Sequence, residues 1–416
     1  MSVRIENIQI AKELISADVF VNEEKNKVWY EFPFDVENIC DNAANALLVA
    51  FIPIAMKVGN RISIDGEISN KLYNQLNHQY QDIMKKWYPE LNRVEIICKK
   101  IYNDKETNNK RKNIACFTGG VDAFYTLIKN NERIDDLLYV WGFDIPLTEE
   151  KFYNKVKKHL STVAKNFEKN IIFVKTNLGY EITNKYASWG DYCYGPAIAS
   201  VILLMNNNYK ICYMPSCNDY SVLVPRGSHI LINHLWNSNG IEFIYDGAEF
   251  SRTEKVDYIT NNKIVQNHLR VCYHSNSAYN CCECEKCIRT MSSLEALGKL
   301  EKVKTFKKKL DISIINKTKL GNPSELKMAE ATLNVALEKG KIELAKQLEI
   351  QILEYETSII IDKLLNNYDA IKDNPKIKVL SEKIVTDNIK NNTKKTTKLL
   401  LKIIIKKIKL KILRKN

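Results

Sequence analysis

The chain has 416 residues, of which 45% are hydrophobic, and a formal net charge of +13. This length exceeds one ordinary hydrophobic core and predicts two or three domains, and the hydrophobic share excludes a mainly disordered protein. Eleven of the cations lie between Lys390 and Asn416, a segment without an acid, so the remainder of the chain carries only +2. The body of the protein is therefore nearly neutral, which argues against a nucleic-acid binder that is basic throughout.

The N-terminal residues Met1 to Glu6 show no apolar signal segment, so we expect a cytoplasmic protein. Its eleven cysteines are then expected to be reduced rather than paired in disulfides. Because no run of about 18 uncharged apolar residues occurs, we expect no segment that crosses a membrane.

Residues 1–110 predict a small N-terminal α+β domain. Short β-rich runs at Asp18–Asn22 and Lys27–Phe32 are bounded by turn residues, and Lys71–Trp87 has a helical pattern. The segment Asn103–Asn113 contains no apolar residue, which is typical of a linker or an exposed loop.

Residues 111–300 alternate apolar runs with helical stretches such as Lys151–Phe167 and Pro196–Met205. Such repetition predicts an α/β fold with a largely parallel sheet covered on both faces. The expected strands are Ile114–Phe117, Leu137–Trp141, Ile171–Val174, Ile211–Met214 and Ile241–Tyr245.

The C-terminal part predicts a helical extension over residues 301–390, interrupted near Gly340, and a basic tail over residues 391–416. Lysines of the tail recur every three or four residues, and leucines and isoleucines recur on another side, as in a basic amphipathic helix. Three partners stay open for it: an anionic membrane surface, which we favour, the body of the protein, and nucleic acid, which the absence of aromatic residues disfavours.

The first candidate site is the segment Thr118 to Ala123, which follows an apolar run and precedes a helical pattern. Gly119 and Gly120 allow the backbone to approach a polyanion, Thr118 offers a hydroxyl donor, and amides at a helix start favour negative charge. Asp122 would orient the loop or help to hold Mg²⁺. A tight strand-to-helix connection without a ligand is the alternative.

The second candidate site consists of four cysteines followed by Arg289. Four thiolates with this spacing suit one tetrahedral Zn²⁺, and such a closed site stabilises a fold and leaves no position for water. Cys282, within the cluster, is expected to be a spectator or a free thiol. The predicted zinc ligands are Cys272, Cys281, Cys284 and Cys287.

Together the two motifs resemble those of the PP-loop ATP pyrophosphatase superfamily, in the same order. Thr118 to Ala123 looks like the Ser-Gly-Gly-x-Asp-Ser signature, and the cysteine motif resembles that of the 7-cyano-7-deazaguanine synthases, especially longer, uncharacterised relatives. The resemblance implies a PP-loop fold of the adenine nucleotide alpha hydrolase type, with ATP and Mg²⁺ as ligands. It also implies an ATP-dependent ligase that forms AMP and pyrophosphate. Thr118, Gly119, Gly120, Val121 and Asp122 would then bind the nucleotide.

The chain departs from the family pattern at several positions. Thr118 keeps a hydroxyl where the family has its first Ser, but Ala123 removes the last one, and an Arg-Asn pair used for substrate is replaced at Tyr194-Gly195-Pro196. We therefore expect a substrate other than deazaguanine precursors.

Further candidates follow other expected strands. Asp144 would contact adenosine or Mg²⁺, and Asn218 and Asp219 are pocket candidates. Arg252, and with it Lys255, would neutralise developing pyrophosphate charge, so Asp122 and Arg252 are the predicted catalytic residues.

The resulting hypothesis is an ATP-dependent carbon–nitrogen ligase that adenylates a small or carrier-bound carboxylate or amide for attack by ammonia or an amine. The alternative is a binding or scaffold protein at the inner face of the membrane that retains the zinc-stabilised fold but has weakened catalysis, motivated by Ala123. A homodimer stays open in either case.

Overall fold

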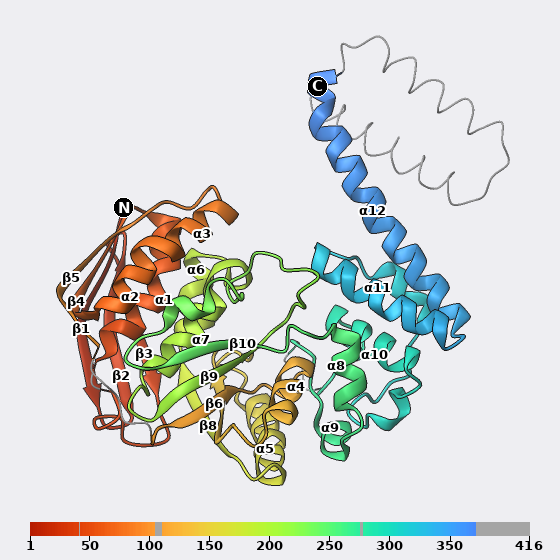
Figure 1. Cartoon of the computed structure of the whole chain (residues 1–416), viewed down its shortest axis with the longest axis horizontal. Helices are drawn as coiled ribbons and strands as arrows, with labels where there is room; N and C mark the ends of the chain where they lie inside the picture. Colours follow the sequence, from red (N-terminus) through yellow and green to blue (C-terminus); the bar gives the residue numbers. More distant parts are fainter. Residues whose placement is uncertain (41, 105–109, 275–277, 372–416) are drawn as a thin grey trace. The chain divides into compact units, whose positions relative to one another are not determined.

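A computed structural model describes residues 1–40, 42–104, 110–274 and 278–371 of the chain (Figure 1). The chain divides into two compact units, Met1–Leu310 and Asp311–Asn416. Both predicted sites lie in the first unit. The boundary predicted at residue 110 falls within this unit, between its fifth and sixth strands.

The first unit is built on one ten-stranded, mixed sheet with the strand order β10-β9-β6-β7-β8-β3-β2-β1-β4-β5. Strands β6 to β10 are all parallel, whereas β1, β2 and β3 form an antiparallel meander. The two parts are joined by antiparallel pairing of β3 with β8, where Tyr30 lies opposite Thr176. The strands are β1 (Val3–Ala11), β2 (Leu14–Val21), β3 (Glu24–Glu31), β4 (Arg61–Ser69), β5 (Glu95–Tyr102), β6 (Lys112–Cys116), β7 (Asp136–Trp141), β8 (Asn170–Thr176), β9 (Tyr209–Pro215) and β10 (Glu242–Asp246).

The parallel strands are buried on both faces, as their apolar runs predict. In β7 all six residues are buried. Because side chains alternate between the faces of a strand, Leu138 and Val140 enter one hydrophobic core, and Leu137, Tyr139 and Trp141 enter another. These two cores lie on opposite sides of the sheet. The N-terminal strands instead mix buried and exposed positions, typical of a sheet with one face covered.

Helices cover the sheet from both sides. Helices α1 and α7 pack against each other and join the first core, while α4, α5, α8, α9 and α10 contribute to the second. Their bounds are α1 (Ala43–Val58), α2 (Asn70–Gln75), α3 (Gln81–Trp87), α4 (Val121–Lys129), α5 (Glu150–Asn166), α6 (Asn184–Tyr186), α7 (Tyr194–Leu203), α8 (Arg252–Ile259), α9 (Lys263–His268) and α10 (Glu285–Ala296).

Short π and 3₁₀ segments connect these elements. The π segments are η1 (Leu76–Tyr80), η2 (Leu178–Thr183) and η3 (Trp189–Cys193), and the 3₁₀ segments are η4 (Asn233–Trp236), η5 (Leu300–Lys302) and η6 (Ile312–Lys317). The helical stretch predicted at Lys71–Trp87 is thus formed by α2, η1 and α3 in succession.

The second unit begins with η6 and contains α11 (Pro323–Glu338) and α12 (Ile342–Ile371). Both helices fall in the predicted helical extension, and Gly340, with φ +65°, separates them as expected. The predicted amphipathic tail at 391–416 lies outside the described residues. In the part of the chain that is described, no helix combines the length and apolar character needed to cross a bilayer.

Candidate functional site

The carboxyl ends of β6 and β9 lie side by side where the connections of the parallel sheet change direction. Strands β6, β7 and β8 follow one another outward, whereas β9 and β10 lie on the other side of β6. Open α/β sheets bind ligands at such a switch point, beyond the carboxyl ends of the strands. Thr118 to Asp122 follow β6 and Ser216 to Asn218 follow β9, so both segments lie at this edge.

Gly119 and Gly120 form the turn between β6 and α4. Gly119 has φ +76°, which suits glycine, and an added Cβ would lie 3.0 Å from Cδ2 of Leu160. Gly120 is the N-cap of α4 and brings no side chain to the first amides of that helix. Thr118 is exposed beside them. The turn therefore leaves a hydroxyl and a helix N-terminus, which favours anions, at the switch point.

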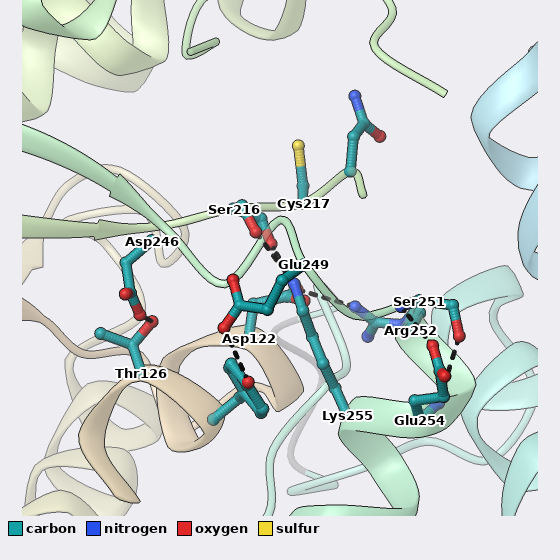
Figure 2. Close-up of polar contacts among 12 residues, drawn as sticks. Asp122, Thr126, Ser216, Cys217, Asp246, Glu249, Ser251, Arg252, Glu254 and Lys255 are labelled. Carbon is teal, nitrogen blue, oxygen red and sulfur yellow. Dashed lines mark hydrogen bonds and ion pairs between the residues drawn. The ribbon is translucent and has the colours of Figure 1, made fainter. Parts of the chain in front are cut away.

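Arg252 and Lys255 are presented by the first turn of α8. The side chain of Ser251 accepts from the amide of Glu254, whose carboxylate accepts in return from the amide of Ser251 at 2.8 Å, forming a capping box. Residues three apart share a helix face, and both cations point toward Asp122 (Figure 2). Nη1 of Arg252 donates to one carboxylate oxygen of Asp122 at 2.8 Å, and Nζ of Lys255 donates to the other at 3.2 Å.

Lys255 is a buried lysine whose side chain is only 2% exposed. Its ammonium also donates to the carbonyl oxygen of Ser216 at 2.8 Å and to the Ser216 hydroxyl at 3.0 Å (Figure 2). Burial by itself raises the pKa of Asp122, but the charges of Lys255 and Arg252 outweigh it and hold this pKa below its usual range. Two cations against one ionised carboxylate leave positive charge beside the glycine turn.

Asp144, which follows β7, is held by two neighbours. Its carboxylate accepts from the hydroxyl of Tyr139 at 2.7 Å and from Nη1 of Arg270 at 2.6 Å. The Arg270 side chain is 3% exposed, and its backbone N–H donates to the carbonyl of Gly119 at 2.8 Å. Arg270 therefore connects Asp144 to the glycine turn, while the side chain of Asp144 stays 30% exposed.

A cavity of about 160 Å³ opens at the ends of β6 and β7. The rings of Phe143 and Trp189 lie 5.0 Å apart at its wall. A side chain at Gly195 would overlap the carbonyl oxygen of Gly227, so only glycine fits at this position. The cavity is lined by Cys116, Phe117, Thr118, Leu138, Val140, Phe143, Asp144, Trp189, Tyr194 and Ile198.

The four predicted zinc ligands meet in one cluster. Their sulfur atoms all lie within 4.8 Å of one another, with Cys272 and Cys284 separated by 3.8 Å and Cys281 and Cys287 by 3.9 Å. A tetrahedral site with Zn–S bonds of about 2.3 Å requires sulfur separations of about 3.8 Å. The backbone N–H of Cys284 also donates to the Cys281 sulfur at 3.2 Å. The cluster is therefore consistent with a zinc site.

Asn280 links the two chain segments that supply these cysteines. The side-chain oxygen Oδ1 of Asn280 accepts from the backbone amides of Val271 at 2.9 Å and Cys272 at 3.2 Å, and its side-chain Nδ2 donates to the backbone carbonyl of Leu269 at 2.9 Å. Cys282 has φ +64°, the conformation that favours glycine, and its thiol contacts the carbonyl of Asn280 at 3.6 Å. Cys282 lies outside the cluster, in agreement with its prediction as a spectator.

Other predicted residues have local partners. Asp219 accepts from the amide of Ser221 at 2.8 Å within a turn, and Asn218 is buried beside Tyr245. Arg289 pairs with Glu285 one turn earlier in α10, at 2.8 Å. The side chains of Asp219 and Arg289 thus have partners within their own turns.

Three residues of the site were not among the sequence candidates: Ser216, Arg270 and Asn280. Ser216 and Arg270 act through partners that are distant in the chain, so local sequence does not reveal them. Asn280 instead bonds to residues at the first end of the cysteine motif, but its type alone does not mark this role. The Ser251-x-x-Glu254 capping box, in contrast, is a local signal that marks the start of α8 and places Arg252 and Lys255 on one face.

The fold and the site together define an α/β protein with a large, mostly parallel sheet and a four-cysteine cluster. Comparisons with models of protein families, with curated proteins and with solved structures found no match to this chain.

Proposed function

We propose that the chain is an ATP-dependent carbon–nitrogen ligase of the PP-loop type. An oxygen of a carboxylate or amide attacks the α-phosphorus of ATP, pyrophosphate leaves, and ammonia or an amine then displaces AMP. The observation that carries this proposal is the meeting of a glycine turn, a helix N-terminus and the cations Arg252 and Lys255 at the switch point of the sheet.

The residues around the glycine turn would have different roles in this reaction. Backbone amides after Gly119 and Gly120 would hold the leaving pyrophosphate, and Lys255 and Arg252 would neutralise the charge that develops on it. Asp122 would act as a positioning residue, because both of its oxygens already accept from these cations. Lys255 already donates to three protein oxygens, so it would act through its charge, and charges fixed in this way need no rearrangement during the reaction.

Mg²⁺ would supply further neutralisation of the phosphates. Carboxylates are its usual protein ligands, and Asp144 is the more accessible of the two carboxylates at this edge. The cavity next to Asp144, with the rings of Phe143 and Trp189, suits a planar base. Zinc in the closed cysteine cluster would stabilise the segment that carries Arg270 and would take no part in the chemistry.

The acceptor would differ from that of the deazaguanine synthases. Tyr194 lines the cavity where those enzymes use a polar pair, and the close approach of Gly195 to Gly227 excludes a side chain at the next position. An acceptor with less polar surface fits this wall better.

A second candidate function is a nucleotide-binding scaffold with weak or no turnover. Ala123, in the first turn of α4, is buried and brings no hydroxyl toward the phosphates. Losing one such hydrogen bond would cost about 1–3 kcal/mol of transition-state stabilisation. Attachment to a membrane would then depend on residues 391–416, which lie outside the described residues.

The test compares nucleotide binding with turnover. Calorimetric titration with Mg²⁺ and α,β-methylene-ATP should show binding that Lys255→Ala weakens about tenfold or more, while Lys165→Ala, an exposed lysine of α5, leaves it unchanged. AMP and pyrophosphate release is then measured with ammonium and a panel of carboxylic acids, using Asp122→Ala as the blank. Binding without turnover favours the scaffold, and absence of binding contradicts both functions.

A further inference from the structure

A groove of about 590 Å³ lies between α5, the end of α9 and the zinc segment. None of its lining residues belongs to the glycine turn, to α8 or to the cavity beside Asp144. Its lining consists of Lys155, His159, Asn267, Ala278, Tyr279, Asn280, Cys281, Cys282, Glu283, Lys304, Thr305, Lys307 and Lys308.

The groove is lined by four lysines and one acid. Lys155 comes from α5, whereas Lys304, Lys307 and Lys308 come from the segment after η5. Lys308 pairs with Glu283, the only acidic residue of the lining. Lys304 Nζ donates to the backbone carbonyl of Glu301 at 2.7 Å, and among the described residues no carboxylate forms an ion pair with it. Lysine side chains from two separate elements therefore line one groove.

The inner wall of the groove is aromatic and polar. The ring of His159 stacks on Tyr279 with centroids 4.1 Å apart, and its Nδ1 lies 2.9 Å from Nδ1 of His268. Thr305, which is 6% exposed, has a buried hydroxyl without a hydrogen-bond partner among the described residues. A buried hydroxyl without a partner costs free energy, so the wall of the groove at Thr305 is not fully satisfied by the described residues.

We propose that this groove is a second binding site, for a small organic anion that carries phosphate groups. Lysines are effective point charges for phosphate, and the volume lies within the range of small-molecule sites. A compact groove, rather than a long basic track with several stacking rings, favours a small ligand over single-stranded nucleic acid. The proposal goes beyond the ligase function and does not depend on it.

The inner wall of the groove is also connected to the glycine turn formed by Gly119 and Gly120. The hydroxyl of Tyr279 donates to the carbonyl of His268 at 3.0 Å, and two residues later Arg270 donates its backbone N–H to Gly119. A ligand in the groove would thus contact a segment that supports the glycine turn, which makes this site suited to an effector.

Calorimetric titration of the full-length, metal-loaded protein with inorganic tripolyphosphate tests the proposal. We expect the wild type to bind at the groove, and Lys255→Ala, which weakens any anion binding at the glycine turn, to retain the groove site. In that background, Lys304→Ala with Lys307→Ala should weaken the remaining site about tenfold or more, whereas the equally charged control Lys157→Ala with Lys165→Ala should not. Equal losses in both double variants would reveal unspecific attraction and overturn the proposal.

Histidine-selective NMR gives a second readout, since the chain has only six histidines. Tripolyphosphate should shift the resonances of His159 in the Lys255→Ala variant, and an unchanged spectrum would contradict the site. Two further results would also overturn it: preferential binding of oligouridylate without competition by tripolyphosphate, or loss of zinc from the groove variant with anion binding intact. The second would show that these lysines serve only to balance the thiolate cluster.

Discussion

Lys255 Nζ lies 3.2 Å from a carboxylate oxygen of Asp122 and bonds at the same time to the carbonyl and hydroxyl oxygens of Ser216. One buried ammonium thus joins α8, the start of α4 and the end of β9. Because the Lys255 side chain is almost completely buried, it depends on these partners, and they depend on it.

Lys255→Met should destabilise the protein by about 3–5 kcal/mol. The substitution leaves the Ser216 oxygens buried without a donor, and it leaves the negative charge of Asp122 paired with Arg252 alone. Urea unfolding measures the loss. Asp122→Asn should also destabilise, and the double variant should lose less than the sum of the two, since the residues act as a pair. Strict additivity would show that the contact contributes nothing to stability.

Gly119→Ala should cost about 1–2 kcal/mol, because alanine is strained at φ +76° and its Cβ would press against Leu160. It should also weaken binding of α,β-methylene-ATP. Gly298→Ala is a matched control, with φ +67° and open space around the added Cβ. This control should lose similar backbone stability and keep nucleotide affinity. A Gly119 variant that binds the analogue normally would place the nucleotide elsewhere.

Cys284→Ser should abolish stoichiometric zinc in the purified protein, because three thiolates and a hydroxyl form a poorer site. Cys282→Gly should retain one zinc per chain and keep the free energy of unfolding within about 1 kcal/mol of the wild type, since relief of the φ +64° conformation offsets the lost side-chain packing. Metal analysis by mass spectrometry and urea unfolding measure both effects. Loss of zinc in the Cys282 variant would assign that thiol to the metal.

The contact between His159 and His268 predicts a dependence of stability on pH. Burial lowers the pKa of both side chains from the ordinary value of 6.5, and for His159 the neighbouring His268 and lysines lower it further. A lowered folded-state pKa means that stability is complete above pH 6.5 and falls as the pH drops below it, because the unfolded chain takes up the protons.

His159→Asn should therefore flatten the decline in the free energy of unfolding between pH 7 and about pH 5.5. His78→Asn, at an exposed position of η1, serves as the control and should follow the wild-type slope. Chemical unfolding at several pH values measures the slopes. Parallel curves for all three proteins would contradict a contribution of the His159 contact.

The apolar runs predicted the five parallel strands and the principal helices to within a few residues, because a strand buried on both faces needs a continuous apolar run. Helix α1 was missed. Its residues from Ala43 to Met56 are all buried, so they lack the polar side that reveals an amphipathic helix, and Pro53 lies within it. Packing against α7 allows this helix to be apolar on every side.

Local sequence determined the features that depend on neighbours in the chain: the four cysteines with metal spacing, the glycine turn before a helix, and the break at Gly340. Arg252 was a candidate from the sequence, but tertiary structure alone decided that it pairs with Asp122 across 130 residues and that β3 joins the N-terminal strands to the parallel sheet. Spacing reports contacts within a turn or a helix, whereas the order of strands in a sheet places distant residues together through packing of the whole unit.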